Sequence, residues 1–214
     1  MKITAITVQA RNKNRVNVAV DGRYRFSLEI NQLVELGLKP GAEFSDEELI
    51  ELEEESTYGK VYARALEYCF VRPRSAREVR DYLYRKTRPV RQKDGTLKPG
   101  VSERITQRVY DRLVEKKHIN DEHFATYWVE NRRTRQGASA RKLSAELQQK
   151  GIERSIIDHA LAETERSDES EIQKVITKKA NRYDDPQKLM AYLARQGFSY
   201  DDIKAALSKE DGQE

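Results

Sequence analysis

The sequence is poor in several features that other classes of protein depend on. It contains one cysteine, Cys69, which excludes an internal disulfide and favours a reducing compartment. It has no apolar run of the roughly 18 residues that a membrane-spanning helix requires, and its first residues lack the apolar core of a signal peptide. Only 37% of the residues are hydrophobic. We therefore expect a soluble protein of the cytoplasm that exposes much surface for its size.

Charge, by contrast, is abundant and unevenly distributed. Asp, Glu, Lys and Arg make up 36% of the chain, whereas an average domain has roughly 25%. Residues 1–56 carry 7 basic and 11 acidic side chains, but residues 57–119 carry 17 basic and 7 acidic ones. Because a local positive field attracts phosphate, this asymmetry points to an anionic partner.

The first 30 residues predict strands around a hairpin. Apolar residues alternate with polar ones on both sides of Asp21-Gly22, which is a strong turn signal. The alternating residues are Val16, Val18, Val20, Tyr24, Phe26 and Leu28. If Val20 pairs with Tyr24, the valines and the aromatic residues share one face, which requires a bulge or a loop of odd length. We predict that arrangement.

Helical signals follow the hairpin. A short helix through Leu33 and Leu36 is expected to end at Gly37. The capping box Ser45-Asp-Glu-Glu48 then predicts the start of an acidic helix. From Ser45 onward the sequence is typical of helices.

A repeat organises this helical part. Ser139 and Asp185 are predicted N-caps, and each precedes two leucines four residues apart. Gly151 and Gly197 follow at the positions where a helix ends in a left-handed residue. An earlier copy begins at Ser75, but an insertion over residues 88–102, with Asp94-Gly95 near its centre, predicts a basic hairpin.

Each copy is preceded by one more helical stretch, so each unit should contain three helices. The predicted fold is mostly α, with three tandem three-helix repeats in an elongated array after a small N-terminal β-hairpin or sheet domain. The predicted boundaries are 1–56 for the β-rich domain with short helices, 57–118 for repeat 1 with its basic insertion 88–102, 119–166 for repeat 2 and 167–214 for repeat 3.

The residues that usually carry catalysis are not arranged for it. His118, His123 and His159 lack metal-ligand spacing to one another and to Cys69, and no glycine-rich loop is suited to phosphate. Cys69 lies on an apolar helical face and is expected in the core. We therefore expect no enzymatic activity, no cofactor and no metal.

Two acid-poor basic clusters at equivalent unit junctions form the candidate binding site. A single arginine on a charged helix is commonly just a solvated surface residue, but two such clusters favour contact with a partner or with nucleic acid. The first cluster contains Arg72, Arg74, Arg77, Arg80, Arg85, Lys86, Arg88, Arg91 and Lys93, and the second contains Arg132, Arg133, Arg135, Arg141 and Lys142.

Two motifs resemble those of the RecX regulatory proteins. Arg72-Pro-Arg-Ser-Ala-Arg-Glu-Val79 is similar to their Arg-x-Arg-Ser-x-x-Glu-Leu motif, and Ile119-Asn-Asp-Glu-His-Phe-Ala125 is similar to their Ile-Asp-Asp-x-x-Phe-Ala motif. The N-terminal hairpin and the segment around Gly151 extend the resemblance over nearly the whole chain. The departures are Val for Leu, Asn for Asp and the long basic insertion.

The resemblance implies modulation of RecA. Members of this family are three tandem three-helix repeats that lodge in the helical groove of the RecA–DNA filament. They commonly inhibit strand exchange, ATP hydrolysis and co-protease activity, and some bind DNA directly. The partners expected from it are RecA, its nucleoprotein filament and single- or double-stranded DNA held by electrostatic contact. We expect no membrane association and a monomeric protein.

Two other functions stay open. A sequence-specific transcription factor would use helix–turn–helix pairs of this kind, but among the third helices only residues 102–117 are basic enough to read bases. A helical scaffold for another protein would use the charge for solubility alone.

Overall fold

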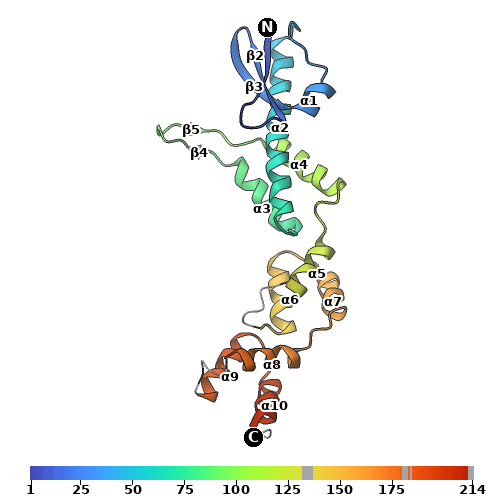
Figure 1. The fold of residues 1–214 in the computed structure, drawn as a ribbon, viewed down its shortest axis with the longest axis vertical. Coiled ribbons are helices and arrows are strands. Elements are labelled where there is room, and N and C mark those ends of the chain that lie inside the picture. The colour runs from blue at the N-terminus through green and yellow to red at the C-terminus, as the bar shows by residue number, and fades with distance from the viewer. Residues whose placement is uncertain (132–136, 180–182, 184, 212–214) are drawn as a thin grey trace. The chain divides into compact units, whose positions relative to one another are not determined.

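The computed structural model describes residues 1–131, 137–179, 183 and 185–211, with the side chains of the last helix described as far as Ser208. The chain separates into two compact units, which are treated individually (Figure 1). The first contains Met1–Arg72 and Val79–Ile119, and the second contains Pro73–Glu78 and Asn120–Glu214.

The first unit begins with a three-stranded antiparallel sheet. Its strands are β1 (Ile3–Val8), β2 (Arg15–Val20) and β3 (Arg23–Glu29), in the order β1-β2-β3. Asp21 and Gly22, which join β2 to β3, have φ angles of 48° and 78°. Positive φ at both central residues is what a tight two-residue hairpin turn requires, so the predicted turn is confirmed.

The predicted register of this hairpin is wrong at its turn end. Val20 pairs with Arg23 rather than with Tyr24, because the turn has only two residues. A register shift beyond Val18 then brings that residue opposite Phe26. The predicted bulge is thus confirmed, but it lies within the strands, and Tyr24 is 62% exposed instead of sharing the buried face.

Two helices cover the sheet. The first is α1 (Ile30–Glu35), which is followed by Gly37 in a left-handed conformation. The second, α2 (Asp46–Phe70), begins at the predicted capping box, in which Ser45 and Glu48 bond to each other's backbone N–H. It is one continuous helix through residue 56, where the sequence predicted a domain boundary. That boundary stays a prediction.

The predicted insertion follows α3 (Ala76–Thr87), and α4 (Glu103–Glu115) comes after it. Strands β4 (Val90–Arg91) and β5 (Leu97–Lys98) form an antiparallel pair, which confirms the hairpin. Helix α4 packs on α2. The apolar residues predicted to face inward, such as Val109 and Leu113, are fully buried, because they recur at helical spacing along one face.

The second unit contains two consecutive three-helix arrangements, each with its own apolar core. Their helices are α5 (Asp121–Asn131), α6 (Ala140–Gln149) and α7 (Arg154–Ala162), then α8 (Asp168–Lys179), α9 (Pro186–Arg195) and α10 (Tyr200–Asp211). Ser139 and Asp185 cap α6 and α9 as predicted. Gly151 and Gly197 have φ angles of 81° and 92°, which confirms the predicted helix ends.

The mostly helical fold expected from the sequence is therefore present, with its small N-terminal sheet. Cys69 is buried within the first unit, in agreement with the expected core position. Across the residues that the structure describes, each helix is too short or too polar to span a bilayer.

Candidate partner-binding surfaces

The start of α3 is bonded to Lys150, the residue at the C-terminal end of α6. We call this set of contacts the Ser75 junction. The buried Ser75 hydroxyl donates to the Lys150 carbonyl at 2.9 Å and accepts from the Glu78 N–H at 3.1 Å. The Lys150 ammonium reaches the Glu78 carboxylate at 2.6 Å. All of these residues belong to the second unit. One hydroxyl thus caps a helix and joins it to the end of another.

The start of α6 repeats this construction at what we call the Ser139 junction. The Ser139 hydroxyl donates to the Gln196 carbonyl at 3.3 Å and accepts from the Lys142 N–H at 3.1 Å. The Lys142 ammonium donates to the Gln196 side-chain oxygen at 2.8 Å and to the Arg195 carbonyl at 3.2 Å. Within the second unit, this contact connects the arrangement of α5, α6 and α7 to that of α8, α9 and α10.

These junctions engage part of the predicted binding clusters. Lys142 is only partly exposed because its ammonium is bonded within the junction. The Arg77 stem lies against Gly151, where an added Cβ would come within 3.0 Å of it. Arg141, one residue before Lys142, is exposed on α6. Nothing in the sequence signalled that cations in these clusters also make contacts within the second unit.

In the first basic cluster, Arg74 and Arg77 belong to the second compact unit, and the other residues belong to the first compact unit. Arg80, Arg85 and Arg88 are exposed, whereas Arg72 and Lys86 are partly buried. The Arg80 guanidinium stacks on Tyr110 and the Lys86 ammonium on Tyr82. Aromatic stacking fixes these cations in place while leaving them available to an anion.

The hairpin formed by β4 and β5, which we call the basic hairpin, is exposed along its whole length. Arg91, Lys93 and Lys98 are exposed, and so are the apolar side chains of Val90 and Leu97, at 63% and 66%. A two-stranded ribbon is narrow enough to enter the major groove of duplex DNA. Cations and apolar groups on one exposed ribbon are suited to contacts with phosphate and sugar.

The tip and the base of this hairpin are ordered by specific bonds. At the tip, Asp94 accepts from the N–H and the hydroxyl of Thr96, and these bonds lower the pKa of its carboxyl. At the base, an added Cβ on Gly100 would lie 1.9 Å from the Thr87 carbonyl oxygen, so only glycine fits there. The one acidic residue of the hairpin is thereby used in its turn.

A further cation near the hairpin was missed at the sequence level. The pKa of Lys60, on α2, is lowered first by burial and then by the positive charges of Arg15, Lys98 and Arg64. Burial is the main cause, and the neighbouring cations add to it because like charges raise the energy of the ammonium. A lone lysine in a long helix gives no sequence signal for this environment.

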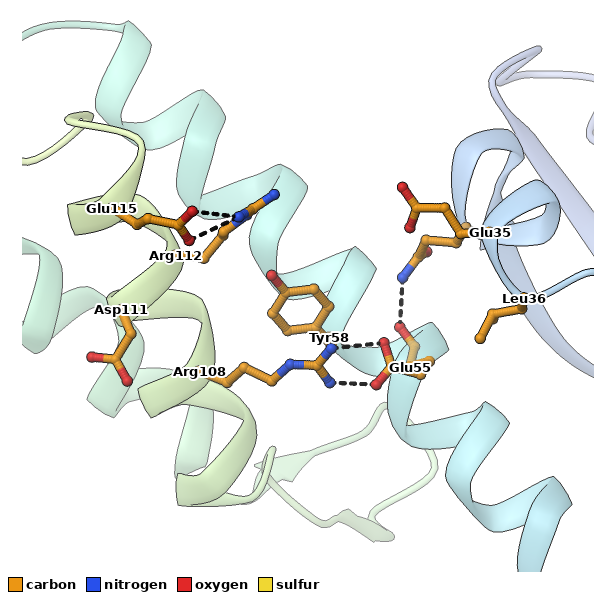
Figure 2. A pocket seen from close by; sticks show the side chains of 9 residues that line it. Glu35, Leu36, Glu55, Tyr58, Arg108, Asp111, Arg112 and Glu115 are labelled. Atoms are coloured by element: carbon orange, nitrogen blue, oxygen red, sulfur yellow. Dashed lines mark hydrogen bonds and ion pairs between the residues drawn. The ribbon is translucent and has the colours of Figure 1, made fainter.

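The arginines of α4 are used differently from those of the hairpin. Arg104 pairs with Glu54 and Arg108 with Glu55, both on α2, and Arg112 pairs with Glu115 at 2.8 Å. Figure 2 shows the Arg108 guanidinium between the Tyr58 ring and the Glu55 carboxylate. These guanidiniums are therefore directed toward carboxylates of the same unit. The predicted residues Arg132, Arg133 and Arg135 lie outside the described residues.

A small antiparallel sheet followed by capped three-helix arrangements places the chain among proteins built from short helical repeats. Three family models match the chain: the regulatory protein RecX N-terminal domain at residues 1–45, the second RecX three-helix domain at 120–161 and the third at 167–207.

Whole-chain comparisons agree with these matches. The regulatory protein RecX of Bacillus licheniformis is 32% identical over 98% of this chain and 77% of its own length. That of Clostridium tetani is also 32% identical, over 97% of this chain and 94% of its own. The chain therefore belongs to the RecX family of regulatory proteins.

Solved structures share the fold. A crystal structure of regulatory protein RecX matches with a TM-score of 0.67 at 23% identity, covering 97% of this chain and 98% of the other. That of RecX from Lactobacillus salivarius gives a TM-score of 0.53 at 25% identity, covering 72% of this chain and 96% of the other.

Proposed function

We propose that this protein regulates RecA by binding the RecA–DNA filament and lowering its strand exchange, ATP hydrolysis and co-protease activity. The observation that carries the proposal is the match along nearly the whole chain to relatives named regulatory protein RecX. A series of stacked repeats can follow the groove of a helical filament. We also propose that it works in the cytoplasm as a monomer.

The basic hairpin and the last turn of α3 are the part of the surface that we propose for DNA contact. Their cations are exposed or held on aromatic rings, and the one hairpin carboxylate is occupied by Thr96. Each phosphate neutralised by a lysine or arginine releases counterions, so binding should weaken steeply with salt. The remaining residues of the two clusters stay predictions from the sequence.

The test measures RecA-driven ATP hydrolysis on single-stranded DNA as this protein is added. We expect inhibition at concentrations well below that of DNA nucleotides, because on this proposal one molecule in the filament groove would contact several RecA subunits. Normal hydrolysis and normal strand exchange in the presence of folded protein would contradict the proposal.

The role of the hairpin is tested by replacing Arg91, Lys93 and Lys98 with Ala. Duplex affinity should fall, and the slope of log affinity against log salt should decrease by about 0.9 for each lost phosphate contact. The matched control replaces three exposed cations elsewhere in the same unit, namely Arg11, Lys13 and Lys39. An equal effect of both triple variants would remove the hairpin from the DNA-contact surface.

The pairing of the α4 arginines argues against the transcription-factor alternative. Recognition of bases needs guanidiniums that are free to donate to base edges, but Arg104 and Arg108 are paired with glutamates of α2. The helix that was basic enough in sequence is thus engaged within its own unit. Sequence preference of a thousandfold among random duplexes would restore this alternative.

A further inference from the structure

The first unit contains a groove bounded by α1, α2 and α4. Two adjoining cavities form it, with volumes of about 590 and 710 Å³, and both are lined by Glu35, Leu36, Glu55 and Arg108. Figure 2 shows the first cavity from close by, with Glu35 and Leu36 on one side and Arg108 on the other. Every lining residue lies in the first unit. We call this feature the acidic groove.

Apolar side chains contribute to the lining of the second cavity. Leu52 and Ile105 are buried, Phe44 is partly buried, and Leu36 is 38% exposed. A patch of apolar surface at the bottom of a groove can bind an apolar side chain of a partner, which releases ordered water from both. The groove therefore provides an apolar contact surface in addition to its charged residues.

The rim of the groove is strongly negative. Its two cavities are lined by three arginines and by seven carboxylates, a formal charge of −4: Glu35, Glu48, Glu51, Glu54, Glu55, Asp111 and Glu115. The arginines are already paired with Glu54, Glu55 and Glu115, as described above. The carboxylates outside these three pairs are all exposed. This rim repels phosphate and attracts cations.

Two of these carboxylates are available for a partner. Within the described part of the chain, the Glu35 and Glu51 side chains make no hydrogen bond or ion pair, although both line the groove. Glu48, by contrast, is bonded to the Ser45 N–H in its capping box. Glu35 and Glu51 are therefore the best placed to pair with lysine or arginine from another molecule.

We propose that the acidic groove docks a basic segment of RecA that carries one apolar anchor residue, while the basic hairpin contacts the DNA. This inference rests on the proposed function and adds a second contact of opposite charge. It assigns the protein and the nucleic acid of one filament to separate surfaces of this chain. Charge complementarity of this kind fixes the register of a bound partner and rejects phosphate.

The test reverses the two available charges with Glu35→Lys and Glu51→Lys. Binding of the full chain to RecA filaments and to RecA without DNA is measured together with binding to DNA alone. We expect about tenfold weaker binding to RecA, because like charges would then meet across the interface. Affinity for DNA alone should be unchanged or slightly higher.

The matched control reverses two exposed acids of the second unit with Glu130→Lys and Glu165→Lys, which gives the same net charge. A neutral variant, Glu35→Gln with Glu51→Gln, keeps the side-chain shape and should give a smaller loss in the same direction. If the groove variants and the control bind RecA equally, the inference is overturned and the proposed function stands. Absence of RecA binding by the unmodified protein would overturn both.

Discussion

The Ser75 and Ser139 junctions of the second unit share their main bonds but use their lysines in opposite directions. In both, a serine hydroxyl caps one helix and donates to the carbonyl at the end of another. At the Ser75 junction, Lys150 extends from the end of α6 toward Glu78 on α3. At the Ser139 junction, Lys142 extends from the start of α6 toward Gln196 after α9.

The two junctions also share a hydrogen bond from a backbone N–H to an aspartate. Asp121 accepts from the Ala76 N–H at 2.7 Å, and Asp168 accepts from the Ala140 N–H at 2.8 Å. Asp121 is the first residue of α5 and bonds to the N-terminus of α3, and Asp168 is the first residue of α8 and bonds to the N-terminus of α6. A negative charge is favourable at these N-termini because of the helix dipole. The two junctions therefore have a serine, an aspartate and a glycine in common, whereas the lysine can come from either of the two connected helices.

The largest predicted loss of stability is that of Gly197→Ala, which should exceed the loss for Gly151→Ala. In Gly197→Ala, the new Cβ would lie 2.5 Å from the Ser139 hydroxyl, in addition to the strain of a left-handed alanine. We expect a loss of about 2–3 kcal/mol in unfolding free energy, combining left-handed strain with a lost cap. In Gly151→Ala the new Cβ would lie 3.0 Å from the Cβ and Cδ of Arg77, a less severe approach, so about 1–2 kcal/mol should be lost. Urea unfolding followed by Trp128 fluorescence measures both, and equal losses would contradict the difference.

The aspartates should give intermediate and equal effects. Asp121→Ala and Asp168→Ala each remove a carboxylate from the start of a neighbouring helix, which should lower stability by about 1 kcal/mol. Asp201→Ala, at an exposed site in the first turn of α10, is the control and should change little. Chemical unfolding monitored by circular dichroism is the measurement. A loss at only one of the two aspartates would show that the junctions differ in more than their lysines.

Replacing the lysines should change stability least, but the coupling free energies at Lys150 and Lys142 should differ. Lys150→Met removes a partly buried ion pair with Glu78, and a double-mutant cycle with Glu78→Gln should yield a coupling of about 1 kcal/mol. Lys142→Met removes bonds to an amide and a carbonyl, so its cycle with Gln196→Ala should yield about half as much. High salt should weaken the first coupling more than the second. Identical salt dependence in both cycles would be inconsistent with this assignment.

Local signals in the sequence were sufficient for the helix ends around the Ser139 junction and at Gly151. Ser139 and Asp185 were recognised as caps and Gly151 and Gly197 as helix ends because these properties depend on neighbouring backbone groups alone. The hairpin register was less predictable. Its bulge followed from the alternation of buried residues, but the pairing of Val20 depended on the length of the turn.

The candidate sites divide in the same way. The sequence identified the basic hairpin, since its cations and its turn residues are adjacent in the chain. It could not identify the acidic groove, because Glu35, Glu51 and Arg108 come from three separate helices. It also could not show that Lys142 is bonded to Gln196, 54 residues away.

Local patterns along the chain were enough to establish the helical repeat, its caps, the basic hairpin and the separation of positive from negative regions. Which charges are available and which are used internally, as Arg104 and Lys142 are, became clear only from the packed helices. These two kinds of interaction differ in the distance along the chain over which they act. Capping and helical periodicity act over a few residues, whereas the pairing of a charge depends on which distant carboxylate or carbonyl the packed helices bring within about 3 Å of it.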